Sequence, residues 1–99
     1  MFFHVVMMRL AGADEACLAR IRYYEERIRR ELPYMHDYRF GRNVAARAKE
    51  FAWVVIGTFD SSADHDRYQA SALHQEMKAF MTPHIVDMVV CDFDASGDK

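Results

Sequence analysis

Residues 2–10 read Phe-Phe-His-Val-Val-Met-Met-Arg-Leu, and most of the chain can be interpreted from this stretch. Its β-branched and aromatic side chains favour a strand, and it is too short to cross a bilayer as a helix. Successive strand side chains point to opposite faces. One face carries Phe2, His4, Val6, Met8 and Leu10, and the other carries Phe3, Val5, Met7 and Arg9. Both faces are apolar, so both need cover, and His4 stands alone as an ionisable group within the apolar run.

The composition is typical of one folded domain. The chain has 99 residues, of which 52% are hydrophobic and 28% charged. We expect a single domain over residues 1–94 and a polar tail over 95–99. The formal net charge is -2, so no basic surplus exists to attract nucleic acid or a membrane surface.

Two cysteines, Cys17 and Cys91, lie among apolar neighbours. A disulfide is one alternative, but two buried free thiols in a reducing compartment are the preferred interpretation. The N-terminal residues lack the basic region and the cleavage site of a secretion signal. A cytoplasmic location is therefore expected by default.

The first half of the chain predicts a helix and an edge strand. Apolar residues recur at helical spacing over 15–32, with charges between them, and Pro33 ends the helix. Residues 35–40 predict a strand whose second face is polar, which is typical of an edge. Residues 41–50 form a long polar connection.

The second half predicts a strand, a broken helix and a strand. Residues 51–59 are apolar on both faces, which predicts a central strand. Ser61 begins a helical segment over 63–82, and we expect a bend near Ser71. Residues 85–93 predict the last strand.

The predicted order is β-α-β-β-α-β, an α+β ferredoxin-like fold. With right-handed crossovers it gives a four-stranded antiparallel sheet with both helices on one face. The other face still carries apolar side chains, each worth about 1.5–3 kcal/mol when buried. The simplest cover is the same face of a second copy, so we expect a homodimer through the helix-free face of the sheet.

Few residues could carry chemistry. No metal-ligand spacing, phosphate-binding loop, dinucleotide fingerprint or nucleophile elbow is present, so no metal or cofactor is expected. His4, Tyr24, Tyr68 and His74 are titratable groups on apolar elements. Taken singly, each is more simply a structural residue. We interpret His36, His65 and His84 as surface histidines.

Several short segments together resemble the stress-responsive A/B barrel domain family, over about residues 3–93. These are Phe3-His4-Val5-Val6, Leu32-Pro33, Phe40-Gly41-Arg42-Asn43, Thr58-Phe59, Tyr68 through His74-Gln75, and Val89-Val90-Cys91-Asp92-Phe93. The resemblance implies a ferredoxin-like monomer whose sheets pair into a dimeric α+β barrel. This agrees with the homodimer expected through the helix-free face of the sheet.

Some members resemble plant polyketide cyclases, which run a cofactor-free aldol-type cyclisation in a pocket between helices and sheet. By that resemblance His4, Tyr68 and His74 are the candidate catalytic residues. The candidate ligand-binding residues are Val6, Met8, Tyr24, Trp53, Val55, Phe80 and Met88. Two positions depart from the pattern: Ser71-Ala72 replaces a His-Pro pair, and Trp53 replaces a third-strand histidine, which reshapes the pocket.

The chemistry of these groups suits such a pocket. A neutral imidazole can take a proton from a carbon beside a carbonyl, and a tyrosine hydroxyl can donate to the oxygen that gains charge. We therefore expect a homodimer of unassigned activity that binds a small apolar or aromatic molecule. The alternatives are a cofactor-free cyclase or lyase with His74 as general base, and a cofactor-free monooxygenase of the antibiotic-biosynthesis type.

Overall fold

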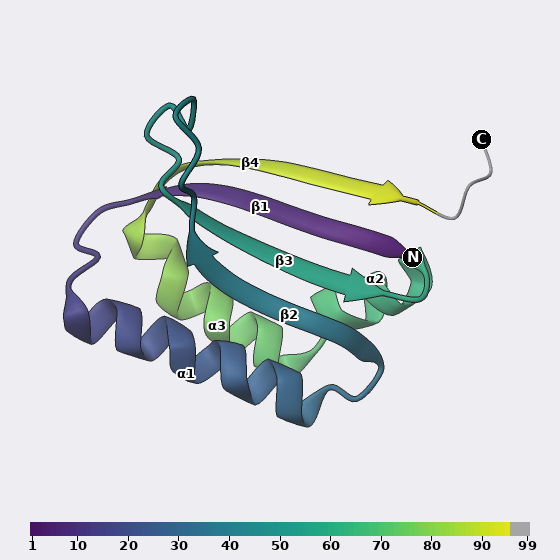
Figure 1. Ribbon diagram of the computed structural model, residues 1–99. Coiled ribbons are helices and arrows are strands. Elements are labelled where there is room, and N and C mark those ends of the chain that lie inside the picture. Colours follow the sequence, from purple (N-terminus) through teal and green to yellow (C-terminus); the bar gives the residue numbers. More distant parts are fainter. Residues whose placement is uncertain (96–99) are drawn as a thin grey trace.

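Four strands form one antiparallel sheet, and the helices lie together beneath one of its faces (Figure 1). The computed structural model describes residues 1–95. The elements are β1 (Phe2–Leu10), α1 (Glu15–Glu31), β2 (Met35–Arg42), β3 (Trp53–Phe59), α2 (Ser62–Gln69), α3 (Ala72–Met81), a short 3-10 helix η1 (Thr82–His84) and β4 (Ile85–Asp94). The α+β ferredoxin-like prediction is confirmed. Of the expected polar tail, residues 96–99 lie outside the described residues.

The strand order is β2-β3-β1-β4, so β2 is an edge strand and β3 is central, as the sequence predicts. The register places Val6 of β1 opposite Val55 of β3 and Val90 of β4. His4 lies opposite Gly57 and Asp92 in the same two ladders. These pairs put the even-numbered residues of β1 on the helix-covered face.

Helix α1 begins where Asp14 accepts a hydrogen bond from the backbone N–H of Cys17 at 2.9 Å. Its apolar stripe, including Ile21 and Ile28, is buried against the sheet. Glu25 is also buried, and its carboxylate accepts a hydrogen bond from the backbone N–H of Phe40 at 2.8 Å. This bond ties α1 to the edge strand β2.

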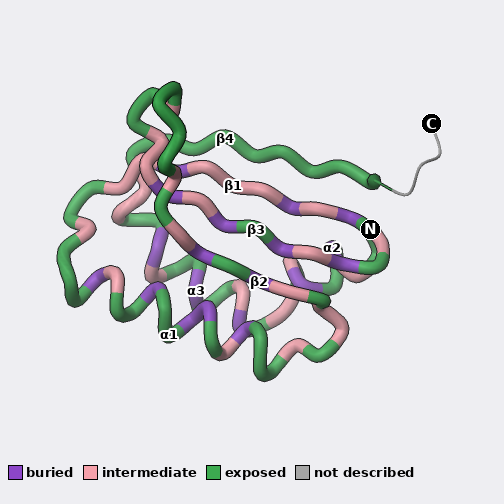
Figure 2. The backbone as a smooth tube through the Cα atoms, in the orientation of Figure 1, coloured by how far each residue is buried: buried purple, intermediate pink, exposed green. Residues whose placement is uncertain are grey.

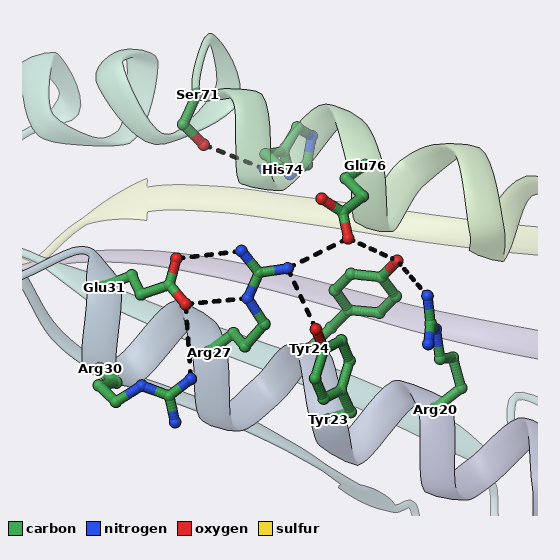
Figure 3. Close-up of polar contacts among 9 residues, drawn as sticks. All are labelled: Arg20, Tyr23, Tyr24, Arg27, Arg30, Glu31, Ser71, His74 and Glu76. Carbon is green, nitrogen blue, oxygen red and sulfur yellow. Dashed lines mark hydrogen bonds and ion pairs between the residues drawn. The ribbon is translucent and has the colours of Figure 1, made fainter.

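The second helical segment divides into two helices at Ser71, as the sequence predicts. The Ser71 hydroxyl donates to the carbonyl of Tyr68 at 2.7 Å, which closes the end of α2. The same oxygen accepts from the backbone N–H of His74 at 3.1 Å and caps α3 (Figure 3). The break places Tyr68 and His74 side by side, with ring centroids 4.6 Å apart.

The helix-free face of the sheet, defined by Phe3, Val5, Met7, Val54, Ile56, Val89 and Phe93, is apolar and partly exposed. Ile56 is 39% exposed, Val89 45% and Phe93 48%. Figure 2 shows that nearly the whole of β4 is exposed. Both cysteines are free, but Cys91 is exposed on β4, so the prediction of two buried thiols is wrong for Cys91. Within residues 1–95, no helix combines the length and apolarity that a membrane crossing requires.

Substituting Ser71 tests the helix break. Ser71→Ala removes the α3 cap and should lower the free energy of unfolding by about 1 kcal/mol. Ser62→Ala is the matched control, because Ser62 is exposed in the first turn of α2 and makes no capping bond. Urea denaturation measures both. Equal stability of the two variants would contradict the capping role.

Candidate functional site

A cavity of about 350 Å³ lies between α2, α3 and the helix-covered face of the sheet. It brings together the three candidate catalytic residues, His4 from β1, Tyr68 from α2 and His74 from α3. Four of the candidate ligand-binding residues also line it, namely Val6, Met8, Val55 and Met88. Further lining residues are Tyr38, His65, Gln69, Met77, Lys78, Met81, Thr82, Ile85, Val90 and Asp92.

Three candidate ligand-binding residues, Tyr24, Trp53 and Phe80, are not among the described residues that line this cavity. Tyr24 is buried between α1 and α3, where its hydroxyl donates to Glu76 at 3.1 Å (Figure 3). Phe80 packs beside Tyr24, with ring centroids 6.1 Å apart. Trp53 stacks on Phe40 at the β2–β3 edge, with centroids 5.4 Å apart. These side chains occupy the hydrophobic core instead.

His4 is buried, and its Nδ1 lies 2.5 Å from a carboxylate oxygen of Asp92. Asp92 stands opposite His4 in the β1–β4 ladder, so strand pairing itself produces the contact. The Nδ1–H of His4 donates to this carboxylate. The interaction explains how an ionisable side chain is accommodated within an apolar strand.

His65 was expected at the surface, and that prediction is wrong. Its side chain is only 8% exposed and packs on His4, with ring centroids 4.5 Å apart. Burial, followed by the nearby His4, lowers the pKa of His65, so the imidazole is neutral at pH 7. The sequence did contain a signal for the burial of His65. It lies three residues before Tyr68, which puts both side chains on one face of the helix.

Tyr68 and Tyr38 form a buried pair of hydroxyl groups. The Tyr68 hydroxyl donates to that of Tyr38 at 3.3 Å, and the Tyr38 hydroxyl donates to the sulfur of Met77 at 3.3 Å. Burial raises the pKa of Tyr38 to about 12 and raises that of Tyr68 further. Both phenols therefore remain protonated at neutral pH and can act as hydrogen-bond donors. Tyr38 was not among the sequence candidates, although it shares a strand face with Phe40.

His74 carries the buried side-chain nitrogen that lacks a partner. Among the described residues, its Nδ1 is the one buried side-chain polar atom without a hydrogen bond. Burial first, then His4, Lys78 and His65, lower its pKa to about 4. At pH 7 the imidazole is therefore neutral, and its residue lines the cavity.

The cavity thus combines an apolar wall with neutral imidazoles, protonated phenols and one carboxylate. Such a lining buries an apolar molecule and orients it through a few polar contacts. The neutral imidazoles can accept protons, and the phenols can donate to an oxygen that gains charge.

The arrangement defines a ferredoxin-like α+β domain with a cavity between its helices and its sheet. The family model described as "Stress responsive A/B Barrel Domain" matches residues 2–95. The chain belongs to this family. No curated protein matches the sequence.

Solved structures share the fold at low sequence identity. A dimeric ferredoxin-like protein of unknown function from Jannaschia sp. CCS1 is 21% identical, with a TM-score of 0.79 over 95% of this chain and 98% of that one. A hydroxynitrile lyase from Passiflora edulis is 21% identical, with a TM-score of 0.81 over 93% and 90%. An antibiotic biosynthesis monooxygenase is 15% identical, with a TM-score of 0.76 over 96% and 98%. At these identities, the likeness shows the fold alone.

The depressed pKa of His74 predicts a pH dependence of stability. Between about pH 4 and 6.5, the unfolded chain binds a proton at this residue that the folded chain does not. The free energy of unfolding should therefore rise with pH across this window, and His65 contributes in the same direction. His74→Gln should flatten the rise, as measured by urea denaturation at several pH values.

The matched variant His36→Gln removes an exposed histidine outside the cavity. It shows how the loss of any one imidazole changes the pH dependence of the free energy of unfolding. A pH slope in His74→Gln equal to that of the unmodified protein would show that His74 does not lose its proton on folding.

Proposed function

We propose that the chain is a homodimer that binds a small apolar or aromatic molecule in the cavity between its helices and sheet. The observation that carries the ligand proposal is the cavity of about 350 Å³, with apolar walls and the unpartnered Nδ1 of His74. The volume lies within the range of natural ligand pockets, roughly 300–1,000 Å³. Two free cysteines, Cys17 and Cys91, fit a reducing compartment, and we place this function in the cytoplasm.

The apolar helix-free face supports the homodimer. Ile56 lies on the central strand β3 of this face, and Val89 and Phe93 lie on the edge strand β4. A contiguous apolar face of this kind is unfavourable in water, and a two-fold dimer covers both copies at once. The dimeric ferredoxin-like protein from Jannaschia sp. CCS1 has a closely similar chain fold, which is consistent with this assembly.

A second candidate function is a cofactor-free lyase or cyclase with His74 as general base and with His4 and Tyr68 orienting or polarising the substrate. The unpartnered His74 Nδ1 favours it, since a general base needs a nitrogen that no protein group already occupies. The likeness to a hydroxynitrile lyase suggests aromatic cyanohydrins as test compounds. In that reaction the base removes the hydroxyl proton, the carbon–cyanide bond breaks to give an aldehyde and a cyanide anion, and the protonated base returns the proton to cyanide, which leaves as hydrogen cyanide.

The ligand proposal is tested by thermal shift with a set of small aromatic alcohols, aldehydes and cyanohydrins. At 100 times its Kd, a bound compound should stabilise the protein by about 2.7 kcal/mol. Met88→Trp should abolish the shift, because Met88 lines the cavity from the exposed strand β4 and the indole would fill the space. His74→Ala should weaken binding by roughly fivefold to tenfold, the loss of one hydrogen bond.

His36→Ala is the control for these variants, since His36 lies outside the cavity. Equal shifts in the unmodified protein and Met88→Trp would refute the cavity as the binding site. Aldehyde release from a cyanohydrin, lost in His74→Ala, separates catalysis from binding alone.

The dimer proposal is tested by light scattering. Ile56→Asp places a carboxylate at the centre of the helix-free face and should yield monomers, since an unpaired charge cannot be buried there. Val44→Asp is the control, because Val44 is 88% exposed in the loop between β2 and β3. Circular dichroism confirms that both fold. A dimeric Ile56→Asp protein would be inconsistent with an interface on this face.

A further inference from the structure

Two histidines and one carboxylate converge at one end of the cavity. His4, His65 and Asp92 each offer a ligand atom, and these atoms all lie within 4.8 Å of one another. They come from three elements, β1, α2 and β4, which are distant in the sequence. The spacing of histidines along the chain gives no sign of this cluster, because the sheet and helix packing assembles it.

The surroundings of the two imidazoles are apolar and aromatic. His65 packs against Phe2 and Phe59, with ring centroids 5.1 and 5.3 Å apart, as well as against His4. An apolar shell of this kind limits the access of solvent to a metal site. A neutral imidazole is the form that ligates a metal.

We propose that His4, His65 and Asp92 form a binding site for one divalent transition-metal ion, such as zinc, with an open coordination position facing the cavity. Two imidazoles and one carboxylate are the protein ligands of several catalytic zinc sites and of the facial triad of non-haem iron(II). The set leaves room for a water or for an oxygen of a bound molecule.

The three side chains must adjust to hold an ion, because their ligand atoms lie within 4.8 Å of one another and not at tetrahedral spacing. Zinc ligands lie about 2.0–2.2 Å from the ion, so neighbouring ligand atoms in a tetrahedral site are roughly 3.3 Å apart. The His4–Asp92 contact of 2.5 Å must therefore open, and its proton leaves as the ion enters. Asp92 can move, because it lies on the edge strand β4 and its side chain is 36% exposed.

Gln69 is suited to a supporting role. Nε2 of His65 lies 3.1 Å from the amide nitrogen of Gln69, one turn further along α2. With the amide turned over, the Gln69 oxygen would accept the Nε2–H of a ring that holds the ion through Nδ1, and so restrain the ring orientation. The proposed ion would make one end of the cavity a Lewis-acid centre, adjacent to the space proposed for an organic ligand.

The metal proposal does not depend on the proposed organic ligand. The metal-free protein can be titrated with zinc alone, and aromatic compounds can be screened without metal. Failure of one experiment therefore leaves the other intact.

The test is isothermal titration of metal-free protein with Zn²⁺, and the expected result is one ion per chain. His65→Gln and Asp92→Asn should each weaken binding by at least tenfold. With Co²⁺ as the probe, the unmodified protein should develop visible absorption bands that both variants lose. Asp92→Asn alters an exposed edge-strand residue, so it serves even if His65→Gln folds poorly.

The controls are unusually close in chemistry. His36→Gln breaks another histidine–carboxylate pair, His36 with Asp60 at 2.6 Å, which is exposed and belongs to no three-ligand cluster of the described residues. Cys91→Ser removes an exposed thiol that lies opposite Val5 on the other face of β4, and so controls for zinc bound outside the site. Both should bind zinc like the unmodified protein. Unchanged affinity in His65→Gln and Asp92→Asn, or no binding to the unmodified protein, would overturn the proposal.

Discussion

The sheet has two apolar faces, and the helices of this chain cover only one of them. Strand β1 shows the constraint most clearly, since His4 and Met8 are buried under the helices while Phe3 and Val5 point to the other side. Burial of apolar area is the main driving force of folding, so the apolar face that a monomer leaves in water is unfavourable. The position of the cavity and the proposed dimer both follow from this division.

The same division concentrates polar groups in the cavity. His4 and Asp92 share the helix-covered face because the β1–β4 register places them opposite each other. Neither α2 nor α3 closes over β4, so the cavity remains open beside that strand. Burial keeps His65 and His74 neutral, which suits both for hydrogen bonding and for proton transfer. A site of this kind costs folding stability, since buried polar atoms such as the His74 Nδ1 forgo water.

Much of the fold could be predicted from periodicity, and the site only in part. The alternation of β1 and β3 placed His4 and Val55 on the cavity side, and the bend at Ser71 brought Tyr68 to His74. Long-range packing was harder to predict. The apolar stripe of α1 predicts which side chains are buried, but not whether a buried side chain lines a cavity or fills the core. Tyr24 was expected in the pocket, but it packs beside Phe80 and donates a hydrogen bond to Glu76. Trp53 was also expected in the pocket, but it packs on Phe40. His65 was assigned to the surface because its sequence neighbours are acidic. Only the packing of α2 on the sheet buries it.

The central claim is that the helix-free face of one copy meets the same face of another. An isotope-filtered nuclear Overhauser experiment on a mixture of labelled and unlabelled chains tests it directly, because it detects only contacts between copies. The account predicts intermolecular contacts to the side chains of Val5, Met7, Val54 and Ile56. Intermolecular contacts confined to the helices, or none at all at high protein concentration, would contradict it.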